Sequence, residues 1–163
     1  MATVERSSPG TPGLWHTILV PVDFSAPSEA ALTYALKLVA ASNAALHVCH
    51  IIPVPHVLDA LYERGFEPEE SVKRIEQKAR QRINEIVRSA SSTLKPHLHY
   101  SEGDARDGVL EWAEKLKADL IVMGTHGRRG AERFFMGSVA EAVIRRASCP
   151  VLTLRGESPR SKG

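Results

Sequence analysis

The sequence predicts an α/β fold, a single domain in which helices cover both faces of a five-stranded parallel sheet. Five short apolar runs occur along the chain, and a segment with helical spacing of apolar residues follows each of the first four. The stretches ILV at 18–20 and LIVM at 120–123 are continuously apolar, which is typical of strands buried on both faces. Because parallel strands need crossover helices, this strict alternation favours a parallel sheet. A length of 163 residues suits one domain.

Each strand and each helix has its own signal. The expected strands span residues 17–23, 45–52, 97–101, 119–124 and 150–155. The expected helices are marked by apolar residues that recur every three or four positions. These markers are Ala31, Leu32, Ala35, Leu36 and Val39 in the first helix, Val72, Ile75, Ala79, Ile83, Ile86 and Ala90 in the second, Val109, Ala113 and Leu116 in the third, and Val139, Val143 and Ile144 in the fourth.

The residues alone leave two strand orders open. Right-handed crossovers allow 2-1-3-4-5 and 3-2-1-4-5, and both orders place ligands at the carboxyl ends of the strands. Residues 1–15 are punctuated by proline and glycine, and residues 156–163 are polar, so we expect flexible tails around a folded domain at 16–155. The connection at 53–68 is long enough to be a functional loop or lid.

Composition and charge exclude several classes of protein. With 43% hydrophobic and 25% charged residues the chain is an ordinary globular one, and a net charge of +2 argues against a nucleic-acid-binding domain or a basic membrane-surface protein. The two cysteines, Cys49 and Cys149, lie too far apart in unlike contexts to suggest a disulfide framework, so we expect buried, reduced thiols. No segment resembles a signal peptide or a membrane span, which makes the cytoplasm the expected location.

The most informative motif follows the fourth expected strand. It reads Gly124-Thr-His-Gly127, and after nine residues Gly137-Ser138 opens the fourth helix. Glycines let the backbone approach a ligand closely, and a helix N-terminus offers free N–H groups, so phosphate is the expected ligand. The motif is not a P-loop, because no lysine lies in it. An alternative without ligand is a capping box, in which Ser138 and Glu141 satisfy the helix start.

Charge strengthens the phosphate interpretation. Residues 124–163 hold eight arginines and lysines against three acidic residues, while the rest of the chain is net acidic. Arg128, Arg129 and Arg133 lie between the glycines, and we include Arg128 among the candidate binding residues. His126 lies there too, but no nucleophile accompanies it, so turn geometry explains it better than catalysis.

A second unusual feature ends the first strand. Proline cannot donate a ladder hydrogen bond, so Pro21 indicates that regular pairing stops there and that Asp23 lies at the carboxyl edge of the sheet. A carboxylate at this edge can accept from a ribose hydroxyl or an adenine amino group. The alternative is that Asp23 only supports the start of the helix that begins near Ser25.

Together these residues resemble the universal stress protein family. The resemblance rests on VPVDFS at 20–25, LHV at 46–48 and VMGTHG at 122–127, with glycine spacing G-x2-G-x9-G-S, and covers nearly the whole chain. It implies the ATP-binding branch, a Rossmann-like, adenine nucleotide alpha hydrolase-like fold with strand order 3-2-1-4-5, and ATP with Mg²⁺ as the cofactor. It assigns the adenosine end to Asp23, the adenine pocket to Val48, the phosphate cradle to Gly124, Gly127, Gly137 and Ser138, and the pocket walls to Pro21, Val22, Met123, Val139 and Ala140. Ala140 stands where some members carry a hydroxyl, so one phosphate contact is absent.

The function expected from these features is that of an ATP-binding stress-response regulatory protein. The alternatives are a slow ATPase or autophosphorylating enzyme, for which no base or metal-binding carboxylate pair is evident, and an interaction or chaperone-like scaffold without nucleotide. We also expect a homodimer through the last strand, residues 150–154, because that strand is an unprotected sheet edge in the 3-2-1-4-5 order. The pair His47 and Cys49 and the pair His97 and His99 could each begin a zinc site, but zinc usually needs four ligands, so metal binding is disfavoured.

Overall fold

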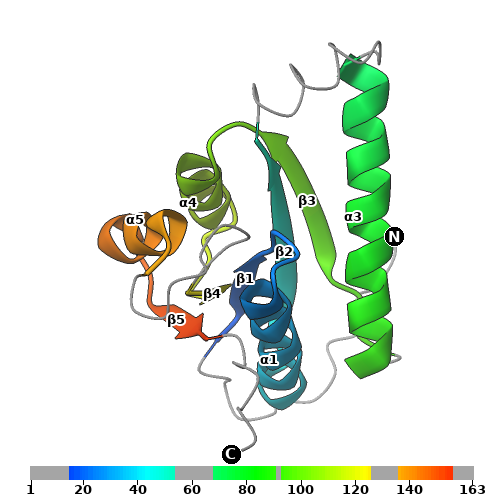
Figure 1. The fold of residues 1–163 in the computed structure, drawn as a ribbon. Coiled ribbons are helices and arrows are strands. Elements are labelled where there is room, and N and C mark those ends of the chain that lie inside the picture. Colours follow the sequence, from blue (N-terminus) through cyan, green and yellow to red (C-terminus); the bar gives the residue numbers. More distant parts are fainter. Residues whose placement is uncertain (1–14, 54–67, 91–92, 126–135, 156–163) are drawn as a thin grey trace, which may run out of the picture.

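Five parallel strands form one sheet in the order β3-β2-β1-β4-β5, the second of the two orders that the residues left open. The computed structural model describes residues 15–53, 68–90, 93–125 and 136–155. Along the chain (Figure 1) the elements are β1 Thr17–Pro21, α1 Ala26–Ser42, β2 Ala45–Ile52, α3 Pro68–Ala90, β3 His97–Glu102, α4 Ala105–Lys115, β4 Leu120–Gly124, α5 Ser138–Arg146 and β5 Val151–Leu154. The expected tails and most of the loop at 53–68 lie outside the described residues.

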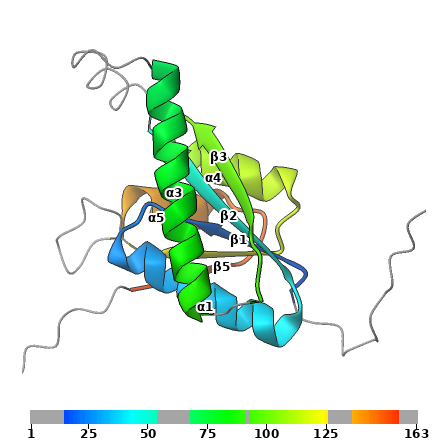
Figure 2. The same cartoon turned by 90° about the vertical axis from the view of Figure 1, so that its right-hand side faces the viewer.

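Helices cover the sheet on both faces, as the continuous apolar strands predicted. α1 and α3 lie on one face, where Figure 2 shows them in front of the sheet, and α4 and α5 lie on the other. Alternate residues of β1 serve the two sides, because Ile18 and Val20 belong to the core under α1 and α3 whereas Leu19 belongs to the core under α4 and α5. Burial of each such side chain, relative to leaving it exposed to water, contributes about 1.5–3 kcal/mol to the free energy of folding.

The start of α1 is defined by its sequence. Ser25 is the N-cap, and its hydroxyl accepts from the amide of Ser28. A proline in the first turn fits because its missing N–H has no helical partner there. Asn43 ends the helix in the left-handed conformation with φ of 56°, and its amide donates to the carbonyl of Val39.

The sequence predicted two of the strands slightly too long. β1 stops at Pro21 rather than at residue 23, and β5 spans Val151–Leu154 rather than 150–155. The middle strands agree within one residue, and β2 agrees fully. No helix within the described ranges is long and apolar enough to cross a membrane.

Candidate functional site at the carboxyl edge of the sheet

Pro21 ends the regular pairing of β1, as the sequence predicted. β1 pairs with β2 from Thr17 to Pro21, but its pairing with β4 covers only Ile18 and Leu19. One further bond follows, in which the amide of Val22 donates to the carbonyl of Cys49 over 2.9 Å. Since the amides of a strand alternate between its neighbours, the nitrogen of Pro21 faces β4, and its missing N–H agrees with a β1–β4 pairing that goes no further than Leu19.

Asp23 sits in the turn that joins β1 to α1. Its Oδ1 accepts from the amide of Ser25 over 3.0 Å and from the hydroxyl of Ser25 over 2.6 Å. Phe24, between them, has φ of 62°, a conformation that costs a non-glycine residue and is held by the surrounding bonds. The helix-supporting role considered for Asp23 is therefore present, and the half-buried carboxylate also lies at the predicted edge.

Gly124 allows the end of β4 to touch the first turn of α1. A Cβ added at Gly124 would lie 2.8 Å from the backbone carbon of Pro27 and 2.9 Å from the amide nitrogen of Ser28. No side chain fits at such distances from backbone atoms. The glycine therefore has a packing role in addition to the phosphate role that the sequence suggested.

The start of α5 lies next to the same strand end. The amide of Gly137 donates to the carbonyl of Thr125 over 2.7 Å, and the amide of Thr125 donates to the carbonyl of Leu154 over 2.9 Å. Gly137, and not Ser138, is the N-cap, and no side chain among the described residues caps the helix. The capping box considered for Ser138 and Glu141 is therefore wrong, because Ser138 is already the first helical residue.

Two helix N-termini thus meet the carboxyl end of β4, that of α1 through Gly124 and that of α5 through Thr125. Each carries partial positive charge from its aligned peptide dipoles, which favours an anion at this edge. The arginines of α5 lie elsewhere. Arg145 pairs with Glu141 and Arg146 pairs with Asp107, in the last turn of the helix and away from Gly137.

The apolar residues predicted to line the pocket fall on both faces of the sheet. Val22 and Val48 pack in the core under α1 and α3, whereas Met123 and Ala140 pack in the core under α4 and α5, with Val139 beside them. Val48 is 0% exposed and lies four residues before the end of β2. Its side chain belongs to the core, so its assignment to an adenine pocket stays a prediction.

The middle of the glycine motif lies outside the described residues. This applies to Gly127, to Arg128 and to His126, which all fall in 126–135. Sequence reasoning missed Thr125 and Ser28, whose backbone groups connect β4 to the two helices. Thr125 lies inside the recognised motif and Ser28 lies three residues after Ser25, but only the folded chain brings the two segments together.

The histidines considered for zinc form a hydrogen-bonded pair instead. Nδ1 of His47 lies 2.9 Å from Nε2 of His99, with the rings 7° from parallel, and His97 stacks on His47. Burial lowers the pKa of His47 and of His99, and the charge of His97 lowers both further. Among the described residues no three His, Cys, Asp or Glu side chains gather as metal ligands.

The thiols have no disulfide partner. Cys49 is fully buried beneath α4 and α5, and burial raises its pKa to about 12. Cys149 is half-buried just before β5, and burial raises its pKa as well. A thiol with a raised pKa holds little thiolate at neutral pH, so neither cysteine is placed to act as a nucleophile.

Comparisons with known proteins identify the family. The model of the universal stress protein family matches residues 15–155. The universal stress protein MJ0531 of Methanocaldococcus jannaschii is 34% identical over 143 residues, which cover 87% of this chain and 83% of that protein. The solved structure of hypothetical protein MJ0577 has the same fold, with a TM-score of 0.74 at 23% identity, over 89% of this chain and 99% of that one.

A universal stress protein solved in complex with cAMP is also similar, with a TM-score of 0.60 and 25% identity. The match covers 88% of this chain and 98% of that chain. The family model and the curated relative agree over almost all of the described fold, and the strand order is the one that the resemblance implied. This chain belongs to the universal stress protein family.

Proposed function

We propose that the protein binds an adenine nucleotide, ATP with Mg²⁺, at the carboxyl edge of its sheet and serves as a nucleotide-responsive regulator of the stress response. The observation that carries the proposal is the meeting of two helix N-termini at Gly124 and Thr125. Because no described side chain caps α5, its first amides are suited to phosphate oxygens. The similar protein solved with cAMP supports an adenine nucleotide as the ligand class.

In this proposal the phosphates face Gly137 and Ser138, with Gly127 and Arg128 completing the cradle. The adenosine end faces Asp23 and Val48, and Pro21, Val22, Met123, Val139 and Ala140 form the walls of the pocket. Asp23 then has two tasks, since Oδ1 already holds Ser25. A carboxylate has about four acceptor positions on its two oxygens, so the turn and a ribose or adenine donor can share it.

Asp23→Asn tests the proposal directly. Asparagine keeps an oxygen for the bonds from Ser25 but removes the charge and half of the acceptor capacity, so folding should persist while affinity for ATP and for adenosine falls about tenfold. Isothermal titration of the purified protein with each ligand measures the change. Asp104→Asn is the matched control, because Asp104 also accepts from a backbone amide at a helix start but lies outside the proposed site. No binding of ATP to the unmodified protein at millimolar concentration would refute the proposal.

We further propose that the protein forms a homodimer through β5. This strand is an edge of the sheet, and its side chains are only half-buried. The carbonyls of Pro150 and Leu154 accept from β4 over 3.0 and 2.9 Å. Because polar groups alternate along a strand, Val151 and Thr153 direct their N–H and C=O groups to the open edge, where a second copy can pair with them.

Thr153→Pro is expected to shift the protein from dimer to monomer, since it removes an outward N–H without touching the ladder to β4. Sedimentation velocity at tens of micromolar measures the shift. Thr153→Val is the control, because valine keeps the N–H and nearly the same shape, and this variant should stay dimeric. An unmodified protein that sediments as a monomer at this concentration would contradict the proposal.

A further inference from the structure

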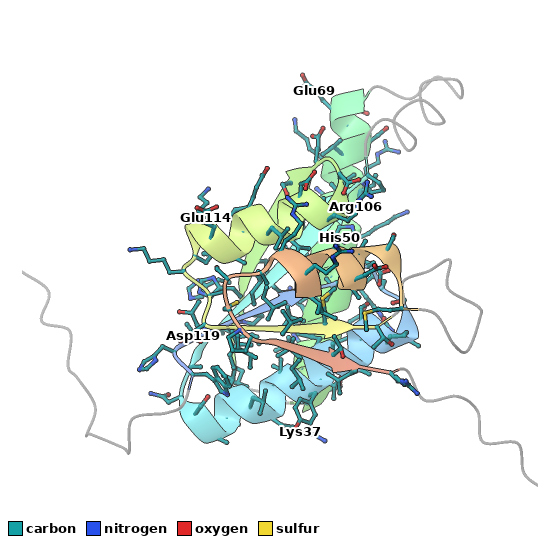
Figure 3. All side chains as sticks on the ribbon, turned by 90° about the vertical axis from the view of Figure 1, so that its left-hand side faces the viewer. Lys37, His50, Glu69, Arg106, Glu114 and Asp119 are labelled. Atoms are coloured by element: carbon teal, nitrogen blue, oxygen red, sulfur yellow. The ribbon has the colours of Figure 1, made fainter. Side chains whose placement is uncertain are left out.

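His50 is a buried polar side chain that belongs neither to the glycine motif nor to the turn around Asp23. It is 6% exposed and lies two residues before the end of β2. Its Nδ1 lies 2.7 Å from the carbonyl oxygen of Val22, and its ring packs against the ring of Phe24 with centroids 4.9 Å apart and planes 48° apart. Figure 3 shows His50 toward the carboxyl end of the sheet, opposite the end where Asp119 lies.

The hydrogen bond stands where the β1–β2 ladder stops. The amide of Val22 still donates to Cys49, but the register of paired residues ends at Pro21. In a continuing parallel ladder the carbonyl of Val22 would accept from a backbone amide of β2. Here the carbonyl of Val22 accepts instead from the imidazole of His50, the residue that follows Cys49. A carbonyl has no proton to give, so Nδ1 of His50 is the donor and carries the hydrogen.

This bond acts on Asp23 through the backbone. The carbonyl of Val22 and the amide of Asp23 belong to one rigid, planar peptide unit. The same unit is held on its other side, since the amide of Asp23 faces the hydroxyl of Ser28 at 3.4 Å. His50 therefore sets the orientation of the peptide that delivers Asp23, and the Phe24 ring against it limits movement of the next residue.

We infer that His50 is a positioning residue of the nucleotide site, which holds the Asp23 carboxylate in place for the adenosine part of the ligand by donating from Nδ1 to the Val22 carbonyl. The inference rests on the proposed function. His50 itself does not contact the ligand. The effect of His50 must therefore fall equally on adenosine and on ATP, because the phosphates are held at the other end of the site.

A pair of variants separates this role from simple packing. His50→Leu replaces the imidazole with an apolar side chain of similar bulk and so removes the donor. The affinities for adenosine and for ATP should fall by a similar factor of about five to fifty, as expected for a buried carbonyl left without its partner. His50→Asn places an amide nitrogen as many bonds from Cα as Nδ1, and it should restore affinity to within about threefold of the unmodified protein. Titration calorimetry gives the affinities, and thermal unfolding confirms that each variant is folded.

The outcomes distinguish this inference from the proposed function. Normal affinity in His50→Leu, or no recovery in His50→Asn, overturns the positioning role alone. An unmodified protein that binds neither ligand overturns both. If His50→Leu does not fold, nitrogen-15 spectra of the imidazole in the unmodified protein decide, because the inference requires the hydrogen on Nδ1 and a neutral ring protonated only on Nε2 overturns it.

Discussion

Gly137→Val is expected to abolish nucleotide binding, with a loss of at least about a hundredfold in affinity, while the protein still folds. A β-branched side chain at the N-cap would stand over the first amides of α5, where the phosphates are proposed to bind. The backbone itself accepts valine, since Gly137 has φ of −64° and ψ of 146°, and no side-chain cap is lost. Titration with ATP measures affinity, and circular dichroism monitors the fold.

The same helix provides a matched control for this change. Ala147, the C-cap of α5, has nearly the same backbone conformation, with φ of −63° and ψ of 139°. Ala147→Val therefore adds a comparable side chain at the opposite end of the helix and should leave ATP affinity unchanged. If Gly137→Val binds ATP as tightly as the unmodified protein, the phosphates do not lie at the start of α5.

Gly124→Ala is expected to produce the largest loss of stability, about 1–3 kcal/mol in the free energy of unfolding. The added Cβ would meet backbone atoms of Pro27 and Ser28 at 2.8–2.9 Å. Backbone atoms in the first turn of a helix cannot rotate away, so either β4 or α1 must shift. Chemical denaturation of the unliganded protein measures the effect independently of any nucleotide.

Gly108→Ala is the control for an added methyl group. Its Cβ would also come close to a neighbour, at 2.9 Å from Cδ1 and 3.2 Å from Cγ1 and Cγ2 of Ile51. These are all side-chain atoms, and the nearest one is the end of a side chain that can change rotamer. In the interior of a helix such as α4, alanine is also more favourable than glycine by about 1 kcal/mol. We therefore expect Gly108→Ala to leave the free energy of unfolding nearly unchanged. Equal losses at both positions would mean that the contact between β4 and α1 is not the rigid one described here.

The sequence by itself determined the fold class and, within two residues at the strand ends, the position of the strands and helices that the structure describes. This succeeded because burial on two faces makes strands such as β1 and β4 continuously apolar, and because helices repeat their apolar residues every three or four positions. These are local signals. The stop of regular pairing at Pro21 was also predictable, since the missing N–H of proline is a property of the residue and not of its surroundings, although the strand itself was expected to run to residue 23.

The tertiary structure decided which segments meet. Periodicity left two strand orders open, and the residues alone could not choose between them. The reason for Gly124 lies nearly a hundred residues away, in the first turn of α1, and the partner of His50 lies across a strand boundary at Val22. The choice of Gly137 over Ser138 as N-cap depends on the bond to Thr125. Such contacts join residues distant in sequence, so no local pattern records them, and only packing of the complete sheet and its helices fixes them.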